Sequence, residues 1–194
     1  MRGLLLLTAG AGPFIAGPAS AHEGTGLPGG VVSGFMHPLS GLDHLLAMVS
    51  VGIWGAFLGR PLVYVLPVVF PAMMVIGAIM GMFGVPLPPV EPAIAVSVLV
   101  LGGCIALAVK APIWAASLLA GLFAMFHGYA HGQELPSAAD PLPYAAGFVL
   151  VTGMLHVAGI GLGTLNNLPR GIVVTRSLGS LIAVIGACFL YRAI

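Results

Sequence analysis

The stretch Leu62–Phe83 reads LVYVLPVVFPAMMVIGAIMGMF, 22 residues without a charged or histidine side chain. A helix needs about 20 mostly apolar residues to cross the hydrocarbon core of a bilayer, so this stretch is long enough to cross it. Strands that span membranes are shorter and alternate apolar with polar residues, which this stretch does not do. The sequence therefore predicts an α-helix that crosses a membrane.

Apolar runs of similar length lie on both sides of this stretch. The whole chain is 59% hydrophobic and 6% charged, whereas a soluble domain has about a quarter charged residues. We predict an all-α fold, a polytopic membrane helix bundle with about six transmembrane helices in a single domain of residues 22–194. The expected spans are Val31–Leu58, Leu62–Phe83, Pro92–Val109, Pro112–His131, Pro143–Gly163 and Gly171–Tyr191. The 29 glycines include G-x-x-x-G pairs at Gly77/Gly81 and Gly159/Gly163, which we interpret as close helix packing.

The N-terminal residues have the pattern of a secretory signal. Arg2 is followed by the apolar run Leu4–Leu7, and Ala19-Ser20-Ala21 has the small-x-small form of a cleavage site. We expect residues 1–21 to be a signal peptide, with an uncleaved anchor helix as the alternative. Cleavage would leave His22 with a free α-amine and an imidazole, which together can chelate an ion; the alternative is a plain remnant of processing.

Charged residues between the spans predict the orientation. Basic residues of cytoplasmic loops follow the positive-inside rule, which places the mature N-terminus outside. The basic residues assigned inside are Arg60, Lys110, Arg170 and Arg176, and the acidic ones assigned outside are Glu23, Glu91, Glu134 and Asp140; Arg192 runs against the rule. We expect a multi-pass protein of the bacterial inner membrane with a periplasmic N-terminus.

Ionisable residues inside membrane spans are costly and usually functional. The candidates for metal binding are His37, Asp43, His44, His127, His131, Glu134 and His156, together with His22. His37 and His44 are two turns apart and His127 and His131 one turn apart, so each pair is expected on one helix face. Asp43 is interpreted either as a direct ligand where Pro38 and Gly41 break the helix, or as a partner that orients an imidazole. A proton relay, or a plain hydrogen bond to a neighbouring helix, remains an alternative for these residues.

Topology also predicts how deep these residues lie. If the first span runs inwards, His44 lies about 20 Å inside the outer surface. This gives a shallow group, with His37, His127, His131 and Glu134, and a deeper group. The deeper group contains Asp43, His44 and His156, so the expected arrangement is a polar column leading towards the membrane centre.

The types of side chain available as ligands limit which metal ions the site could bind. Imidazole and carboxylate without thiolate suit nickel, cobalt, zinc or iron(II). Cys104 and Cys188 are far apart and form no C-x-x-C pair, so a thiolate site has no support. A copper(I) path along the methionines of the expected span Leu62–Phe83 is an alternative to their role in packing. These methionines are Met73, Met74, Met80 and Met82.

Three stretches resemble the HupE/UreJ family of nickel and cobalt permeases. They are HPLSGLDHLLAM at 37–48, FHGYAHGQE at 126–134 and TGMLHVAG at 152–159, and the expected mature start His22-Glu23 is similar too. The resemblance implies ATP-independent uptake of nickel or cobalt into the cytoplasm, as transported substrate and not as a prosthetic group. It also implies function for His37, Asp43 and His44, with contributions from His127, His131 and Glu134. The resemblance implies a functional role for His156 less directly.

Other functions stay open at this point. The chain has no Walker loop and no basic cluster, so neither ATP nor nucleic acid is an expected partner. We expect a transporter and no enzyme, embedded in lipid and passing its ion to nickel or cobalt chaperones or enzymes. The alternatives are a metal-binding sensor or accessory protein without transport, an intramembrane metalloenzyme, and a proton-coupled carrier of an organic solute.

Overall fold

The structure, a computed structural model, describes residues 30–134 and 141–194. The helices are α1 (Val31–Ser40), α2 (Leu42–Leu58), α3 (Leu62–Met82), α4 (Val90–Ala106), α5 (Ile113–Glu134), α6 (Pro141–Gly163), the short 3-10 helix η1 (Thr164–Asn167) and α7 (Gly171–Ala193). Within those two ranges there is no strand, which confirms the predicted all-α class. The expected signal peptide, His22, Glu23 and Asp140 lie outside the described residues.

The single helix expected over Val31–Leu58 was wrong. Gly41 has an extended backbone with φ −93° and ψ 110°, and it separates α1 from α2 with a bend of 87°. Pro38 lies inside α1, where its ring removes one helical hydrogen bond. The first expected span is therefore either a broken span or a re-entrant element.

Four helical segments in the described part of the chain are long and apolar enough to cross a membrane. They are Leu62–Met82, Ile113–Gln133, Leu142–Asn167 and Gly171–Ala193, and the bent pair α1–α2 makes a fifth if it counts as one span. α4 is apolar but has only 17 residues. A multi-pass membrane protein is thus supported, whereas the number six stays a prediction.

Glycines allow α3 and α5 to touch backbone to backbone. A Cβ atom at Gly128 would lie 2.0 Å from the carbonyl oxygen of Met74, and one at Gly132 would lie 2.1 Å from that of Ala78. The residue numbers of the contacting pairs increase together along both helices, so α3 and α5 run parallel. This contact holds the part of α5 that carries two histidines.

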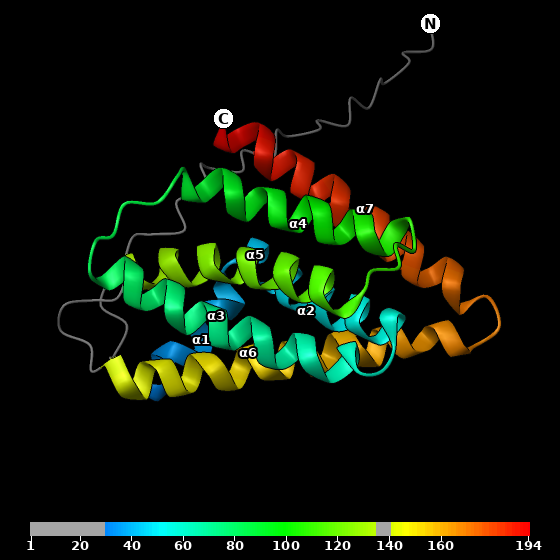
Figure 1. Cartoon of the computed structure of the whole chain (residues 1–194), viewed down its shortest axis with the longest axis horizontal. Coiled ribbons are helices and arrows are strands. Elements are labelled where there is room, and N and C mark those ends of the chain that lie inside the picture. The colour runs from blue at the N-terminus through cyan, green and yellow to red at the C-terminus, as the bar shows by residue number, and fades with distance from the viewer. Residues whose placement is uncertain (1–29, 135–140) are drawn as a thin grey trace, which may run out of the picture.

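The two G-x-x-x-G pairs noted in the sequence both lie in such contacts. Gly77 and Gly81 face the backbone of α5, and Gly159 and Gly163 face α2, which runs parallel to α6. A similar glycine contact joins α4 to α7, which run in opposite directions. These relative directions are those of segments that cross a membrane alternately, and Figure 1 shows α4 and α7 together on one side of the bundle with α6 on the other.

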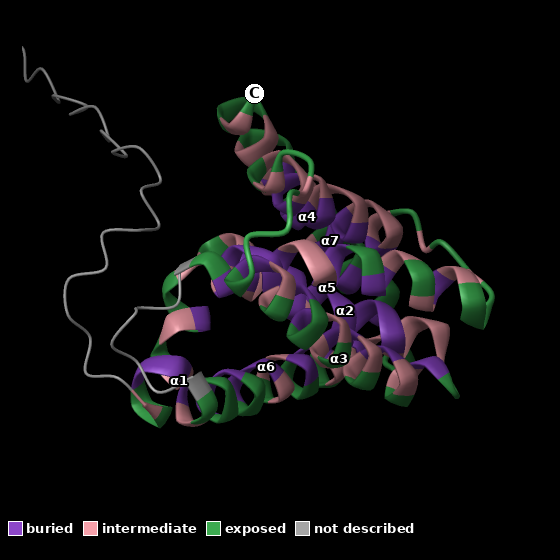
Figure 2. Cartoon of the chain, turned by 60° about the vertical axis from the view of Figure 1, so that its left-hand side comes forward, coloured by how far each residue is buried: buried purple, intermediate pink, exposed green. Residues whose placement is uncertain are grey.

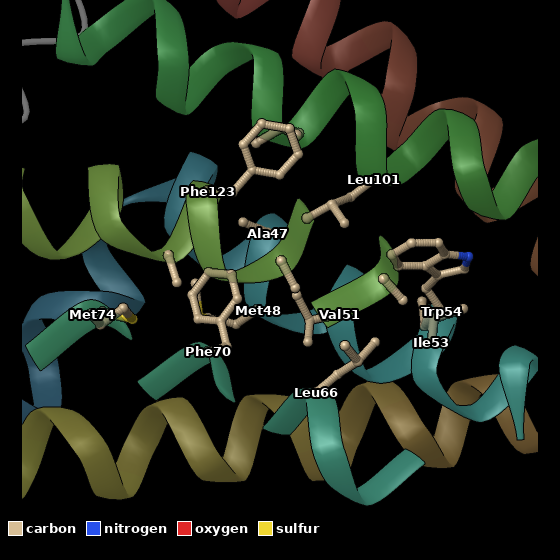
Figure 3. Packing of buried hydrophobic residues seen from close by; sticks show 14 of the residues in the cluster. Ala47, Met48, Val51, Ile53, Trp54, Leu66, Phe70, Met74, Leu101 and Phe123 are labelled. Carbon is tan, nitrogen blue, oxygen red and sulfur yellow. The ribbon is translucent and has the colours of Figure 1, made fainter. Parts of the chain in front are cut away.

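The core lies around α2, which packs on α3, α4 and α6. Figure 3 shows Met48, Val51 and Trp54 of α2 among large side chains of the neighbouring helices. The Trp54 indole N–H donates to the carbonyl of Val109 at 3.0 Å, which ties the C-terminal part of α2 to the segment before α5.

The outside of the bundle is apolar. Figure 2 shows exposed residues along the outward faces of the helices, and they include large aliphatic side chains such as Val68 and Leu118, which are 69% and 67% exposed. A soluble protein rarely exposes apolar surface on this scale, so lipid is the natural surrounding of these faces.

Candidate metal-ion path

Four histidines from three helices form a continuous chain of contacts. Nε2 of His37 lies 2.9 Å from Nδ1 of His131, whose Nε2 lies 3.0 Å from Nδ1 of His44. That Nδ1 atom lies 3.3 Å from Nδ1 of His127, and Nε2 of His127 lies 2.8 Å from the hydroxyl of Ser97. We call His37, His131, His44 and His127 the histidine chain.

The break at Gly41 makes this chain possible. On one straight helix His37 and His44 would lie about 10 Å apart along the axis. In the bent pair both imidazoles reach the same partner, His131, from α1 and from α2. The expectation that His37 and His44 share one face of a single helix was therefore wrong.

The division into a shallow and a deep group was also wrong. His44, expected deep, contacts both His127 and His131, expected shallow. α5 presents its two histidines one turn apart, as the sequence predicted, and the ring of His44 contacts both of them. The four histidines therefore form one connected unit.

Exposure decreases along the histidine chain. His37 and His131 are half-buried, while His44 and His127 are 2% and 1% exposed. The ring of Phe148 on α6 lies 4.7 Å from that of His131 and 5.2 Å from that of His44, so it closes one side of the chain. An ion moving along the chain would thus pass from a half-buried to a fully buried position.

Asp43 lies in the first turn of α2. Its Oδ1 atom accepts a hydrogen bond of 2.7 Å from the backbone N–H of His44, a place where a carboxylate is favoured by the helix dipole. Asp43 thereby holds the start of α2 and brings a half-buried negative charge next to His44. A role as ion ligand stays a prediction.

His156 lies apart from the chain. The ring of Phe70 on α3 lies 5.5 Å from the ring of His156 and 6.0 Å from that of His127, so it is a neighbour of both imidazoles. His156 is 0% exposed, and neither of its ring nitrogens has a hydrogen-bond partner in the part of the chain that the structure describes. Leaving buried polar groups unpaired costs about 1–3 kcal/mol each, which favours a functional reason for this histidine.

The position of Glu134 is described less fully than those of the histidines. Glu134 is the last residue of α5, three positions after His131, and its side chain lies outside the described part.

The cysteines do not join the chain: Cys104 is half-buried and Cys188 is exposed. Of the methionines weighed as a copper(I) path, Met74 belongs to the apolar core and Met82 is 50% exposed.

The imidazoles hydrogen-bond to one another in this state. Among the described residues no group of three or more His, Cys, Asp or Glu side chains is already arranged around a metal position. An ion would therefore have to replace the hydrogen bonds of the chain as it binds.

Ser97 of α4 is the site residue that sequence reasoning missed. It is 0% exposed and ends the histidine chain. A hydroxyl side chain within the apolar run of α4 could have drawn attention to Ser97. Nothing in the sequence, however, indicates that this hydroxyl contacts α5.

Comparison with known proteins agrees with the sequence resemblance. A family model described as HupE / UreJ protein matches residues 11–189. The chain belongs to the HupE/UreJ family. It is 44% identical to "Protein HupE" of Rhizobium leguminosarum bv. viciae over 177 residues, which cover 91% of this chain and 93% of that protein. No solved structure matches. The family is one of nickel/cobalt transporter type and is not an enzyme family.

Proposed function

We propose that this protein carries nickel or cobalt ions across the bacterial inner membrane into the cytoplasm, without ATP, through the histidine chain. The observation that carries the proposal is the unbroken series of ring-nitrogen contacts from half-buried His37 to fully buried His127. Membership of a nickel/cobalt transporter-type family supports the choice of ion.

The nitrogen spacings suit transfer from one ligand to the next. A metal–nitrogen bond of about 2.0–2.1 Å places two nitrogens of one ion about 2.9–3.4 Å apart in octahedral or tetrahedral geometry. Neighbouring nitrogens of the chain lie 2.9, 3.0 and 3.3 Å apart. An ion held by one imidazole can therefore bind the next before it leaves the first.

The remaining candidates extend the path at both ends. His22 and Glu134 would offer the first ligands on the periplasmic side, and Asp43 would offset part of the cost of a cation in a low-dielectric interior. His156, next to Phe70 and with no hydrogen-bond partner for either ring nitrogen among the described residues, would be the next ligand on the inward side.

The membrane potential supplies the driving force. A charge entering a negative interior gains about 2.3 kcal/mol per 100 mV, so a divalent ion gains roughly twice that. At 100 mV this gain corresponds to an ion concentration more than about a thousandfold higher inside than outside at equilibrium. Nickel or cobalt chaperones and enzymes in the cytoplasm would then receive the ion.

Uptake of radiolabelled nickel and cobalt into proteoliposomes tests the proposal. We expect flux that follows an imposed inside-negative potential and is lost in His44→Ala. Ser117→Ala is the matched control, because its buried hydroxyl has no hydrogen-bond partner in the described residues and lies ten positions before His127. Folded wild-type protein that binds nickel but passes none would overturn the proposal and favour a metal-binding accessory role.

A further inference from the structure

Ser97 is the only hydroxyl residue of α4, and it is 0% exposed. Its hydroxyl lies between two groups, the carbonyl oxygen of Ile94 at 2.6 Å and Nε2 of His127 at 2.8 Å. We propose that Ser97 is a positioning residue that holds His127 in the Nε2–H form and thereby makes Nδ1 of His127 the atom that binds the ion. This inference rests on the proposed function, because it specifies how one member of the histidine chain takes part.

The hydroxyl has a single hydrogen, and the distances decide where it goes. Two oxygens 2.6 Å apart need a hydrogen between them, and a carbonyl cannot supply one. The hydroxyl of Ser97 therefore donates to Ile94. Its oxygen can then only accept from the ring of His127, so Nε2 of the neutral imidazole carries the hydrogen.

The other nitrogen of His127, Nδ1, then carries a lone pair and no hydrogen. This Nδ1 atom faces Nδ1 of His44 at 3.3 Å, and the same His44 atom lies 3.0 Å from Nε2 of His131. Nδ1 of His44 thus contacts one ring nitrogen of each α5 histidine, and in this form His127 presents a lone pair to it. Only an unprotonated nitrogen can bind a metal ion.

The opposite form of His127 would make its Nδ1 atom unavailable to the ion. With the hydrogen on Nδ1, His127 could not bind a cation through the atom that faces His44. Ser97 would also have to turn its hydrogen to Nε2 of His127, which would leave the 2.6 Å contact with Ile94 as two facing lone pairs. Because Ser97 is anchored to the backbone of its own helix, it is a fixed acceptor that selects one form.

Nitrogen-15 NMR of the metal-free protein in bilayers tests the assignment directly. At about pH 8.5, where histidine is ordinarily neutral, we expect His127 to carry its hydrogen on Nε2 and none on Nδ1. Wild-type protein with the hydrogen on Nδ1 would overturn the proposal. This readout needs neither metal nor flux, so it stays decisive if the transport proposal fails or if a Ser97 variant does not fold.

The Ser97→Ala variant tests the consequence for the ion. Loss of a group that orients a metal-binding histidine typically weakens metal affinity about 10–100-fold. We expect a loss of this size in nickel titrations of Ser97→Ala, a mixture of both His127 forms in its NMR spectrum, and wild-type behaviour in Ser117→Ala. Folded Ser97→Ala with wild-type affinity and an unchanged His127 form would contradict the role of Ser97.

Discussion

Nε2 of His131 lies 3.0 Å from Nδ1 of His44, a contact between residues 87 positions apart in the sequence. The contact joins the two parts of the path, because His131 is also the partner of His37 and His44 is also the partner of His127. The order of the four residues in space, and not their order in the sequence, therefore determines what each substitution should do.

Substituting His131 should do more harm than substituting His37. His131→Ala separates His37 from the other two imidazoles, whereas His37→Ala leaves the contacts among His131, His44 and His127 in place. We expect nickel uptake to fall by roughly 10–100-fold or more in His131→Ala and by clearly less in His37→Ala. Initial rates of uptake by matched amounts of folded protein measure both, and equal losses would argue against a sequential path.

Gly128→Ala should separate α3 from α5. Its new Cβ would lie 2.0 Å from the carbonyl oxygen of Met74, so the helices must move apart at a cost of about 1–3 kcal/mol. We expect a lower thermal unfolding temperature and lower uptake, since His127 is the preceding residue. Gly161→Ala is the control, because its Cβ would meet nothing within 4 Å, and the two variants should differ clearly in unfolding temperature.

Gly41→Ala should disturb Asp43 without straining the backbone. The φ of −93° suits any residue, but a Cβ at this position would lie 3.0 Å from Oδ1 of Asp43. Alanine also favours helix over the extended backbone that separates α1 from α2. We expect weaker nickel binding in isothermal titration, and unchanged binding would show that neither the bend nor the Asp43 carboxylate position matters for the ion.

His156→Leu should lower nickel uptake without lowering the stability of the protein. The nitrogens of this buried imidazole lack partners within residues 30–134 and 141–194, so replacing it by an apolar side chain of similar size removes an unfavourable burial. We expect an unfolding temperature equal to or higher than that of the wild type, together with lower nickel uptake. A destabilised protein with normal uptake would assign His156 a purely structural role.

The sequence predicts the helices of this protein well and the neighbours of its histidines poorly. Long apolar runs bounded by Pro, Gly and charge determine where α3, α5, α6 and α7 lie, because only lipid can surround such helices. The i, i+4 spacing of His127 and His131 likewise predicts their common face, since both lie within one regular helix.

The histidine chain could not be predicted in the same way. Pro38 and Gly41 indicated a disturbed first helix, but not a bend of 87° that brings His37 and His44 to one partner. Which helix lies next to which depends on glycine contacts such as Gly128 with Met74, between positions far apart in the sequence. Ser97 was missed for the same reason, because its importance comes entirely from contact with another helix.

Nickel K-edge X-ray absorption of protein loaded with one nickel ion per chain is the most direct test of the central claim that the ion binds within the histidine chain. We expect the multiple scattering of at least two imidazoles around nickel in the wild type, and fewer in His44→Ala. A nickel shell of oxygen atoms alone, or an imidazole shell that His44→Ala leaves unchanged, would contradict the claim.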